Sequence, residues 1–180
     1  PGSQGGTYSA YVPPTNSFHN NSPVFNEFPP IFICLNAPLK FDHSATDADG
    51  DVLVYSLCSP FVGGSSSDPS PTSPPGPPFN EVTWESGYSA TNPLGNNSLT
   101  INANTGFLTG TPNTIGQFVV GICVSEYRNG TLIGTYVRDF QFNVTQCNIP
   151  IASIPSSNIN PTNGNGIYTT NCSNMHVQFQ

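Results

Sequence analysis

Charged side chains are scarce in this sequence, and basic ones are the scarcest. The 180 residues include 3 Lys and Arg against 10 Asp and Glu, which gives a net charge of −7, and only 7% of residues are charged. Typical soluble domains have roughly 25% charged residues. A protein with so few cations cannot neutralise a phosphate backbone, so nucleic-acid binding is excluded. An anionic lipid surface is unfavourable for the same reason.

Long apolar runs are also lacking. No run approaches the roughly 20 residues that a membrane-spanning helix requires, so we expect no membrane insertion in this segment. The chain is interrupted by 19 prolines and 17 glycines. Because Pro removes an amide donor and Gly costs backbone entropy, long helices are not expected.

The sequence contains no motif that would support catalysis. The three histidines, His19, His43 and His176, are scattered along the chain. There is no nucleophile elbow, no phosphate-binding loop and no paired-histidine metal motif. We therefore expect a protein that is not an enzyme.

Short segments in which apolar and polar residues alternate recur along the chain. Such period-two segments, separated by Gly, Pro, Asn and Asp, are typical of antiparallel strands. Asn129-Gly130 is a strong hairpin signal between the last two segments. The segments are 39–44, 53–58, 99–102 and 132–144, and residues 117–124 form an almost continuous apolar run, as expected for a central strand. The pattern predicts an all-β, immunoglobulin-like antiparallel β-sandwich.

Regions of low complexity flank and interrupt the predicted sandwich. Residues 60–79 are rich in Pro and Ser, so we expect a long exposed loop with polyproline character. The loop is either a simple excursion between strands or a recognition tip for a proline-binding partner. We expect a piece of a longer protein: the end of a preceding module or linker at 1–23, the sandwich at 24–147, a linker at 148–170 and the start of a following domain at 171–180.

Three carboxylates lie within five residues, at Asp47, Asp49 and Asp51. Their mutual repulsion is costly unless a cation offsets it, and carboxylate oxygens at a turn suit Ca²⁺. Glu126, at the end of a predicted strand, is expected to join them. The sequence therefore predicts a Ca²⁺ site at these four residues. The alternative is a solvated acidic turn in which Asp47 forms an Asx-turn and Gly50 supplies a positive φ.

The same segment superficially matches the start of an EF-hand. The match fails because Val52 stands where that loop needs Gly, Cys58 stands where it needs Glu, and the flanks are predicted strands. A helix–loop–helix calcium site is therefore excluded. For a calcium site in a β-sandwich, Asp139 is a further candidate ligand.

Two phrases of the sequence resemble a known family. Residues 45–57 are similar to the A-x-D-x-D-G-D-x-L-x-Y-S-L phrase of cadherin-like repeats, and residues 99–112 resemble the T-G-x-L-x-G-T-P phrase of bacterial immunoglobulin-like and cadherin-like repeats. The match covers about residues 30–146. It implies a cadherin-like sandwich. The cadherin inter-repeat calcium also uses a Glu near the first strand and an Asp-Arg-Glu phrase. Glu27 is a poor substitute for the first and the second is absent, so a single ion is expected.

The wider chain resembles large surface proteins of Bacteroidota. These carry PKD-type repeats and gliding-motility-associated sorting domains for type IX secretion, and residues 172–179 resemble the opening of a PKD-type domain. The resemblance implies a structural or adhesive repeat at the bacterial cell surface, in gliding motility or cell adhesion. Its partners would be neighbouring repeats of the same chain and a surface glycan or protein.

The five cysteines are spaced singly, which argues against a zinc site and favours disulfides formed in an oxidising compartment. In an immunoglobulin-like sandwich the first strand runs beside the last, so Cys34–Cys147 is the preferred clamp. Cys58 and Cys123 fall on strands expected to be neighbours. Four cysteines allow three arrangements, and Cys172 is left over.

The alternative function is a carbohydrate-binding module of a secreted enzyme. Trp84 and Tyr88, with nearby acidic residues, would form its glycan contact. The competing interpretation is that Trp84 belongs to the core of the sandwich.

Overall fold

The computed structural model describes residues 4–11, 13–14, 19–65, 67–68, 77–96 and 98–147, with side chains from residue 6 onward. They belong to a compact unit that ends at Cys147. The linker predicted at 148–170, the domain start predicted at 171–180 and most of the Pro-rich run lie outside the described residues, as do His176 and Cys172. In the described part of the chain, no helix is long and apolar enough to cross a membrane.

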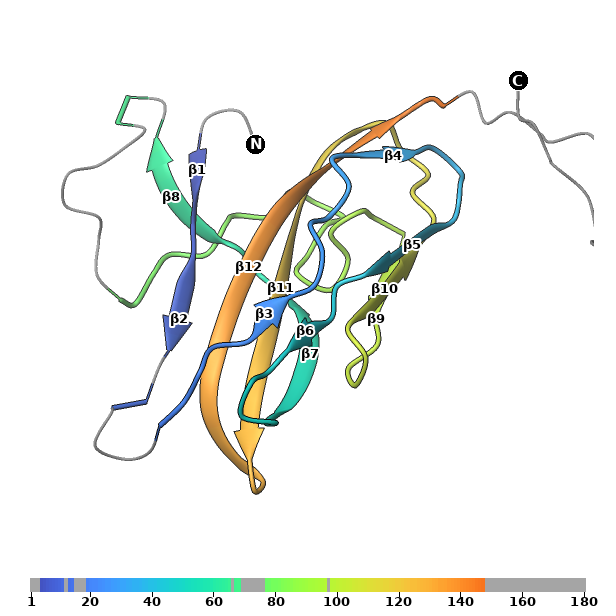
Figure 1. Ribbon diagram of the computed structural model, residues 1–180. Coiled ribbons are helices and arrows are strands. Elements are labelled where there is room, and N and C mark those ends of the chain that lie inside the picture. The colour runs from blue at the N-terminus through green and yellow to red at the C-terminus, as the bar shows by residue number, and fades with distance from the viewer. Residues whose placement is uncertain are drawn as a thin grey trace, which may run out of the picture. The chain divides into compact units, whose positions relative to one another are not determined.

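The described chain is all-β, as predicted, and contains no helix (Figure 1). Its strands, in chain order, are β1 (Gln4–Thr7), β2 (Ser9–Tyr11), β3 (Val24–Phe25), β4 (Phe32–Cys34), β5 (Leu39–Asp42), β6 (Ala45–Thr46), β7 (Val52–Cys58), β8 (Phe61–Ser65), β9 (Leu99–Ile101), β10 (Phe107–Gly110), β11 (Gly116–Arg128) and β12 (Thr131–Thr145).

Two sheets form the sandwich. The larger has the order β2-β12-β11-β7, with β4 added in parallel to the end of β12, and the smaller has the order β5-β10-β9. In Figure 1 the smaller sheet lies to one side of the long β11–β12 pair. Two further pairs, β1–β8 and β3–β6, complete the described part.

Alternating side chains fill the space between the sheets. In β5, Leu39 and Phe41 are buried while Lys40 and Asp42 are exposed, which is the pattern predicted from the sequence. The buried side chains that line up from the other main strands are Leu99, Leu108, Phe118, Val120, Ile122, Val124, Tyr136, Phe142 and Val144. Burial of these side chains supplies the main stabilisation of the unit.

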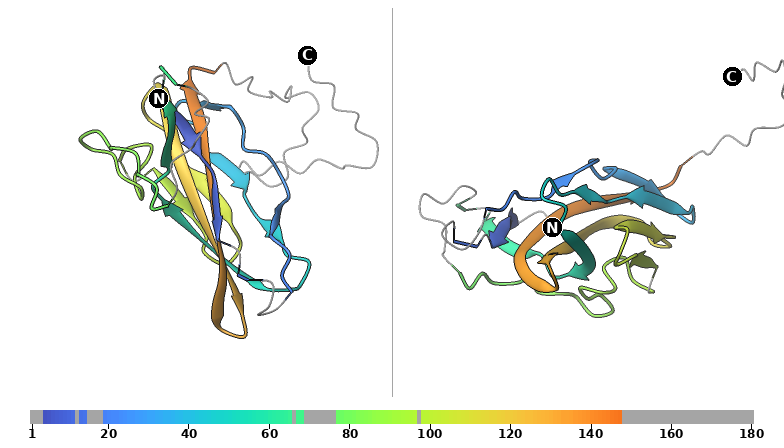
Figure 2. Two further views of the ribbon diagram at one scale, coloured as in Figure 1. Left: turned by 90° about the vertical axis from the view of Figure 1, so that its left-hand side faces the viewer. Right: turned by 60° about the horizontal axis from the view of Figure 1, so that its bottom comes forward.

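The β11–β12 hairpin forms the central pair of strands in the larger sheet. It runs the length of the unit and its tip extends beyond the other strands (Figure 2, left). Asn129 and Gly130 form its turn with φ values of 51° and 78°, as a type I′ turn requires. The register shifts between Glu126 and Tyr127, and such a bulge redirects the side chains beside it.

Two disulfides brace the sandwich, and they are the pairs expected from the sequence. Cys34–Cys147 joins residues 113 apart in the sequence, and Cys58–Cys123 joins residues 65 apart. The first bond is possible because Cys34 lies beside Thr145 in the parallel β4–β12 pair. The second bond links the neighbouring strands β7 and β11.

The N-terminal segment differs from the prediction. Strand β2 pairs with β12 and β1 pairs with β8, so residues 4–11 belong to the same compact unit as the sandwich and not to a preceding module. The physical reason is that β12, at 15 residues, is longer than β4 can cover. A long strand edge left unpaired is unfavourable, and β2 covers part of it.

The start of the Pro-rich run also differs from the prediction of an exposed loop. Residues 61–65 form β8, and Pro60 is fully buried. The ring of Phe61 lies 5.5 Å from the ring of Phe79. Apolar residues at the two ends of the run therefore pack, although its Ser- and Pro-rich middle carries no pattern that predicts structure.

Candidate metal centre

The turn between β6 and β7 is organised by Asp47. Its Oδ1 accepts hydrogen bonds from the backbone N–H groups of Asp49, at 2.9 Å, and Asp51, at 3.0 Å. Gly50 has a φ of 79°, a conformation that favours glycine. The Asx-turn considered in the sequence analysis is thus present, and it leaves the second oxygen of Asp47 for other contacts.

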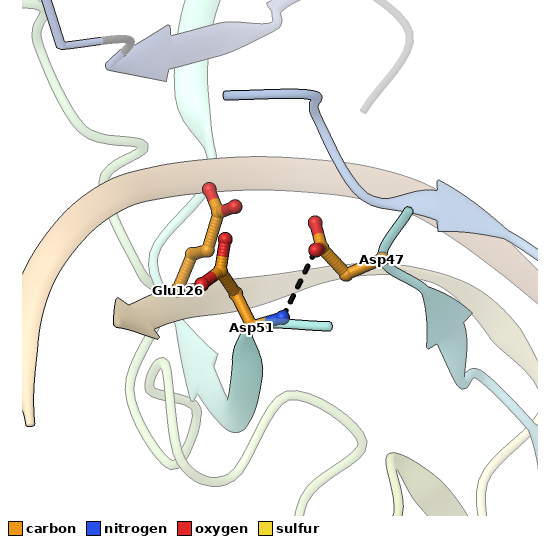
Figure 3. A group of neighbouring side chains, drawn as sticks. All are labelled: Asp47, Asp51 and Glu126. Carbon is orange, nitrogen blue, oxygen red and sulfur yellow. Dashed lines mark hydrogen bonds between the residues drawn. The ribbon is translucent and has the colours of Figure 1, made fainter. Parts of the chain in front are cut away.

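Three of the four predicted ligands come together. Asp47, Asp51 and Glu126, here called the carboxylate cluster, each offer one oxygen, and these oxygens all lie within 4.8 Å of one another (Figure 3). Asp47 and Asp51 come from the β6–β7 turn. Glu126 comes from β11, where it faces Leu53 of β7 in the register. The bulge and the turn therefore direct carboxylates from distant parts of the chain to one point.

Glu126 is the innermost member of the cluster, with 0% of its surface exposed. Asn20 Nδ2 donates to both of its oxygens, at 2.9 and 3.0 Å, and the Tyr136 hydroxyl donates to Oε2 at 2.8 Å. Burial raises the pKa of Glu126 because the charged form loses hydration. Three donated bonds partly offset that cost.

Asp51 is held by an arginine from the hairpin. Arg128 donates Nε to Oδ1 at 2.7 Å and Nη2 to Oδ2, and the Asp51 side chain is 3% exposed. The hydrogen bonds from Arg128 lower the pKa of Asp51. Arg128 also donates to the carbonyl of His19 and to Asn20 Oδ1, each at 2.8 Å. It therefore links the β6–β7 turn, the hairpin and the segment at residues 19–21.

Asp49 does not join the cluster, although the sequence predicts it as a ligand. Its oxygens accept the backbone N–H of Asn21 at 2.6 Å and the Asn21 side-chain amide. Arg128 Nη2 lies 3.4 Å away. The bond from the Asn21 backbone lowers the pKa of the Asp49 carboxyl. Asp49 thus anchors the 19–21 segment instead.

One oxygen of the carboxylate cluster lacks a hydrogen-bond donor in the described part of the chain. Asp47 Oδ2 is buried and has no hydrogen-bond partner among the described residues. A buried carboxylate oxygen without a donor is costly, and a cation close to Asp51 and Glu126 would supply the missing partner. Three hard oxygen ligands suit Ca²⁺, whose remaining ligands would be carbonyls or water. The three carboxylates could thus hold a metal ion, and its identity as Ca²⁺ stays a prediction.

Sequence reasoning missed the polar residues that surround the carboxylates. Asn20, Asn21 and Tyr136 hold the acidic side chains in place. Arg128 carried a signal, since it stands only two positions after Glu126 in the sequence. Asn20 carried none, because its contact with Glu126 spans 106 residues.

Trp84 and Tyr88, the predicted glycan contacts, have other roles in the structure. Trp84 is half-buried and donates Nε1–H to Ser59 Oγ at 3.1 Å. The Tyr88 ring packs against the core with its centroid 5.9 Å from that of Phe118. Contact with a sugar through this pair stays a prediction that the geometry does not favour.

Comparison of the chain with protein-family models, with curated proteins and with solved structures finds no match. The resemblance to cadherin-like repeats of Bacteroidota surface proteins therefore stays a prediction based on the two sequence phrases.

Proposed function

We propose that this chain is a non-catalytic structural or adhesive repeat of a large secreted cell-surface protein, stabilised by disulfides and by one Ca²⁺ ion. The observation that carries the calcium part is the buried, unpartnered oxygen of Asp47 beside two further carboxylates. Two disulfides fit an extracellular location, because such bonds persist in oxidising compartments.

The proposed role of the ion is to join separate segments of the unit. Asp47 and Asp51 belong to the β6–β7 turn, while Glu126 belongs to the β11–β12 hairpin and is bonded to Asn20. A cation bound by all three would attach the turn to the hairpin. Extracellular modules commonly bind Ca²⁺ with dissociation constants of about 10⁻⁴–10⁻³ M. The extracellular setting would thus favour occupancy.

Thermal unfolding with Ca²⁺ and with EDTA tests the calcium part. At a Ca²⁺ concentration about 100 times the dissociation constant, the free energy of unfolding would rise by about 2.7 kcal/mol, and the midpoint by roughly 5–10 °C. An unchanged midpoint would remove the ion from the proposal.

Matched variants locate the effect. Asp47→Asn keeps the oxygen that caps the turn and removes the charge, so it is expected to abolish the calcium response. Asp68→Asn removes one charge from an exposed position that bonds through its backbone to Ser65, and it is expected to keep the response. An equal loss in both variants would show that general charge, and not the cluster, binds the ion.

The two sequence phrases and the all-β fold support a bacterial cell-surface setting. Gliding motility and type IX secretion rest on the resemblance alone. Protease accessibility of the protein on intact cells tests the location, and complete protection until the cells are lysed would contradict it.

A further inference from the structure

The outer face of the β5-β10-β9 sheet carries an unusual set of side chains. Strand alternation sends Leu39, Phe41, Leu99 and Leu108 into the core. The opposite side of the same three strands is left to solvent. Its residues are Lys40 and Asp42 from β5, Phe107 and Thr109 from β10, and Thr100 from β9.

The register groups these side chains tightly. Phe107 lies opposite Asp42, and Thr109 lies opposite Thr100. They line an open hollow of about 740 Å³ on the sheet, together with residues of the two adjoining turns. The main lining residues are Asp42, Thr100, Asn102, Thr105, Phe107 and Thr109.

Hydrogen bonds fix the polar part of the lining. Asn102 Oδ1 accepts the backbone N–H groups of Asn104 and Thr105, each at 3.0 Å. The amide is thereby oriented, and its NH₂ group has no partner among the described residues. The hydroxyl oxygens of Thr100 and Thr109 lie 3.0 Å apart. Donors and acceptors are therefore held in place at the rim of the hollow.

Phe107 gives the hollow an apolar surface. It is 40% exposed, although its neighbours on the same strand pair are polar. An exposed aromatic ring presents a flat apolar face against which a C–H surface can stack. Ligand sites commonly combine such a face with a few well-placed polar groups.

The charge of the hollow limits the class of ligand. Asp42 is the charged group of the lining, and the Ser44 hydroxyl and backbone N–H hold its pKa below the ordinary value. Lys40 lies on the same face opposite Thr109, but Asp42 lines the hollow itself and the chain has a net charge of −7. An anionic ligand is therefore unfavourable. A purely apolar ligand would leave the Asn102 NH₂ group without a partner.

We propose that this hollow binds a neutral glycan, with the Phe107 ring stacking on one sugar face and Asp42 and Asn102 bonding to sugar hydroxyls. A pyranose is uncharged, has an apolar C–H face and carries hydroxyls around its rim, which matches the lining. The inference rests on the adhesive part of the proposed function, whose ligand class it names. It uses no residue of the carboxylate cluster and differs from the Trp84 and Tyr88 alternative.

The test uses the full chain against soluble neutral polysaccharides, namely a β-1,3-glucan, a β-1,4-xylan, an α-mannan and dextran, with a sulfated glycan as the anionic probe. Retardation in affinity gel electrophoresis and titration calorimetry measure binding. We expect at least one neutral polysaccharide to bind and the sulfated probe not to bind. Phe107→Ala is expected to weaken binding at least tenfold at an unchanged melting temperature.

Control variants define the outcomes. Phe28→Ala removes a ring that is 90% exposed elsewhere and is expected to keep binding. Asp42→Asn is expected to weaken binding, whereas Ser67→Ala, at an exposed site outside the hollow, is not. Loss of binding in Trp84→Ala but not in Phe107→Ala would overturn the inference. It would also be overturned by binding of the sulfated probe alone, by binding of none of the neutral polysaccharides, or by a Phe107-dependent protein ligand without glycan binding.

The same samples separate this inference from the calcium proposal. Glycan binding that persists in EDTA, with no effect of Ca²⁺ on the melting temperature, would support the hollow and remove the ion. A calcium-dependent midpoint without any glycan binding would leave the ion and remove the hollow.

Discussion

His43 lies wholly buried between aromatic rings. The ring centroids of Phe25, Phe41 and Phe140 lie 4.9, 6.0 and 5.7 Å from its own. Neither ring nitrogen has a hydrogen-bond partner in the described residues. Burial, together with the nearby charge of Arg138, lowers the pKa of His43 from 6.5 to about 4. The folded protein therefore holds this imidazole neutral at physiological pH.

This histidine gives the stability a pH dependence. Because the unfolded state takes up the proton more readily, the free energy of unfolding falls as the pH drops from about 6.5 to about 4, by up to about 3 kcal/mol. His43→Leu is expected to remove this component, so the variant gains stability relative to the parent as the pH falls. Urea unfolding at several pH values measures the difference.

The exposed His19 provides the control. His19→Gln changes an exposed side chain, and its pH profile should follow that of the parent. A His43→Leu profile that runs parallel to the parent from pH 7.5 to pH 4.5 would rule out His43 as the responsible group.

Gly134 faces Glu126 across the hairpin. A Cβ at this position would lie near Glu126 Oε2 and 3.0 Å from the Tyr136 hydroxyl oxygen. Glu126 cannot move aside without breaking its bonds to Asn20 and Tyr136. The absence of a side chain here is thus a requirement of the cluster.

Gly134→Ala is therefore expected to reduce the free energy of unfolding by about 1–3 kcal/mol and to weaken any calcium response. Thr135→Ala, at the adjacent position on the opposite face of β12, serves as the control. Its free energy of unfolding should fall by less. Equal losses in chemical denaturation would show that the contact with Glu126 is unimportant.

Single residues explain why the site was only partly predictable. Asp47, Asp51 and Glu126 were predicted because local repulsion and strand ends are visible in the sequence. Asp49 was placed with them for the same reason. In the structure Asn21 and Arg128 hold it away from the cluster. Such contacts depend on a segment that arrives from far along the chain.

At the scale of elements, Arg128 attaches the irregular segment at residues 19–21 to the end of β11. Its guanidinium group makes a bidentate pair of hydrogen bonds to Asp51 and also donates to His19 and Asn20. A lysine ammonium lacks the planar fork that makes these bonds together. The guanidinium group thus helps to hold the segment, together with the bonds from Asn21 to Asp49 and from Asn20 to Glu126.

Arg128→Lys is expected to lower the free energy of unfolding by about 1–2 kcal/mol and to increase hydrogen exchange at residues 19–21. Arg138→Lys is the comparison variant, because that guanidinium stacks on Phe25 and bonds to the Glu27 carbonyl. Protection of residues 19–21 that is unchanged in Arg128→Lys would contradict the role given to this side chain.

Long strands were predictable and short ones were not. The segments 53–58 and 132–144 alternate over enough residues to reveal β7 and β12, and the continuous apolar run at 117–124 reveals β11. Strands β3 and β6 have two residues each, too few to show any period. In β8 the glycines obscure the pattern, and the strand forms because β1 pairs with it. Tertiary pairing decides such elements.

At the scale of the whole unit, the two disulfides constrain the unfolded chain most strongly. They close loops of 113 and 65 residues, and the chain-entropy account gives roughly 4–5 kcal/mol for each. The double variants C34A/C147A and C58A/C123A are expected to lose stability of this order in urea unfolding. Loss of Cys34–Cys147, which closes the longer loop, should lower the free energy of unfolding by about 0.5 kcal/mol more than loss of Cys58–Cys123. An unchanged midpoint in either variant would show that its bond adds no net stability.

The Cys34–Cys147 bond also decides how the unit carries tension. When the chain is pulled at a point before Cys34 and a point after Cys147, the force passes through the disulfide. The residues between the two cysteines therefore do not carry it. Reduction of the disulfide would let the force extend the chain between them, which spans 113 residue steps. At roughly 3.4 Å per residue, the extended length would grow by about 380 Å. The bridge therefore limits how far the unit can extend under tension, and in the structural repeat proposed above this limit would hold while the bond stays oxidised.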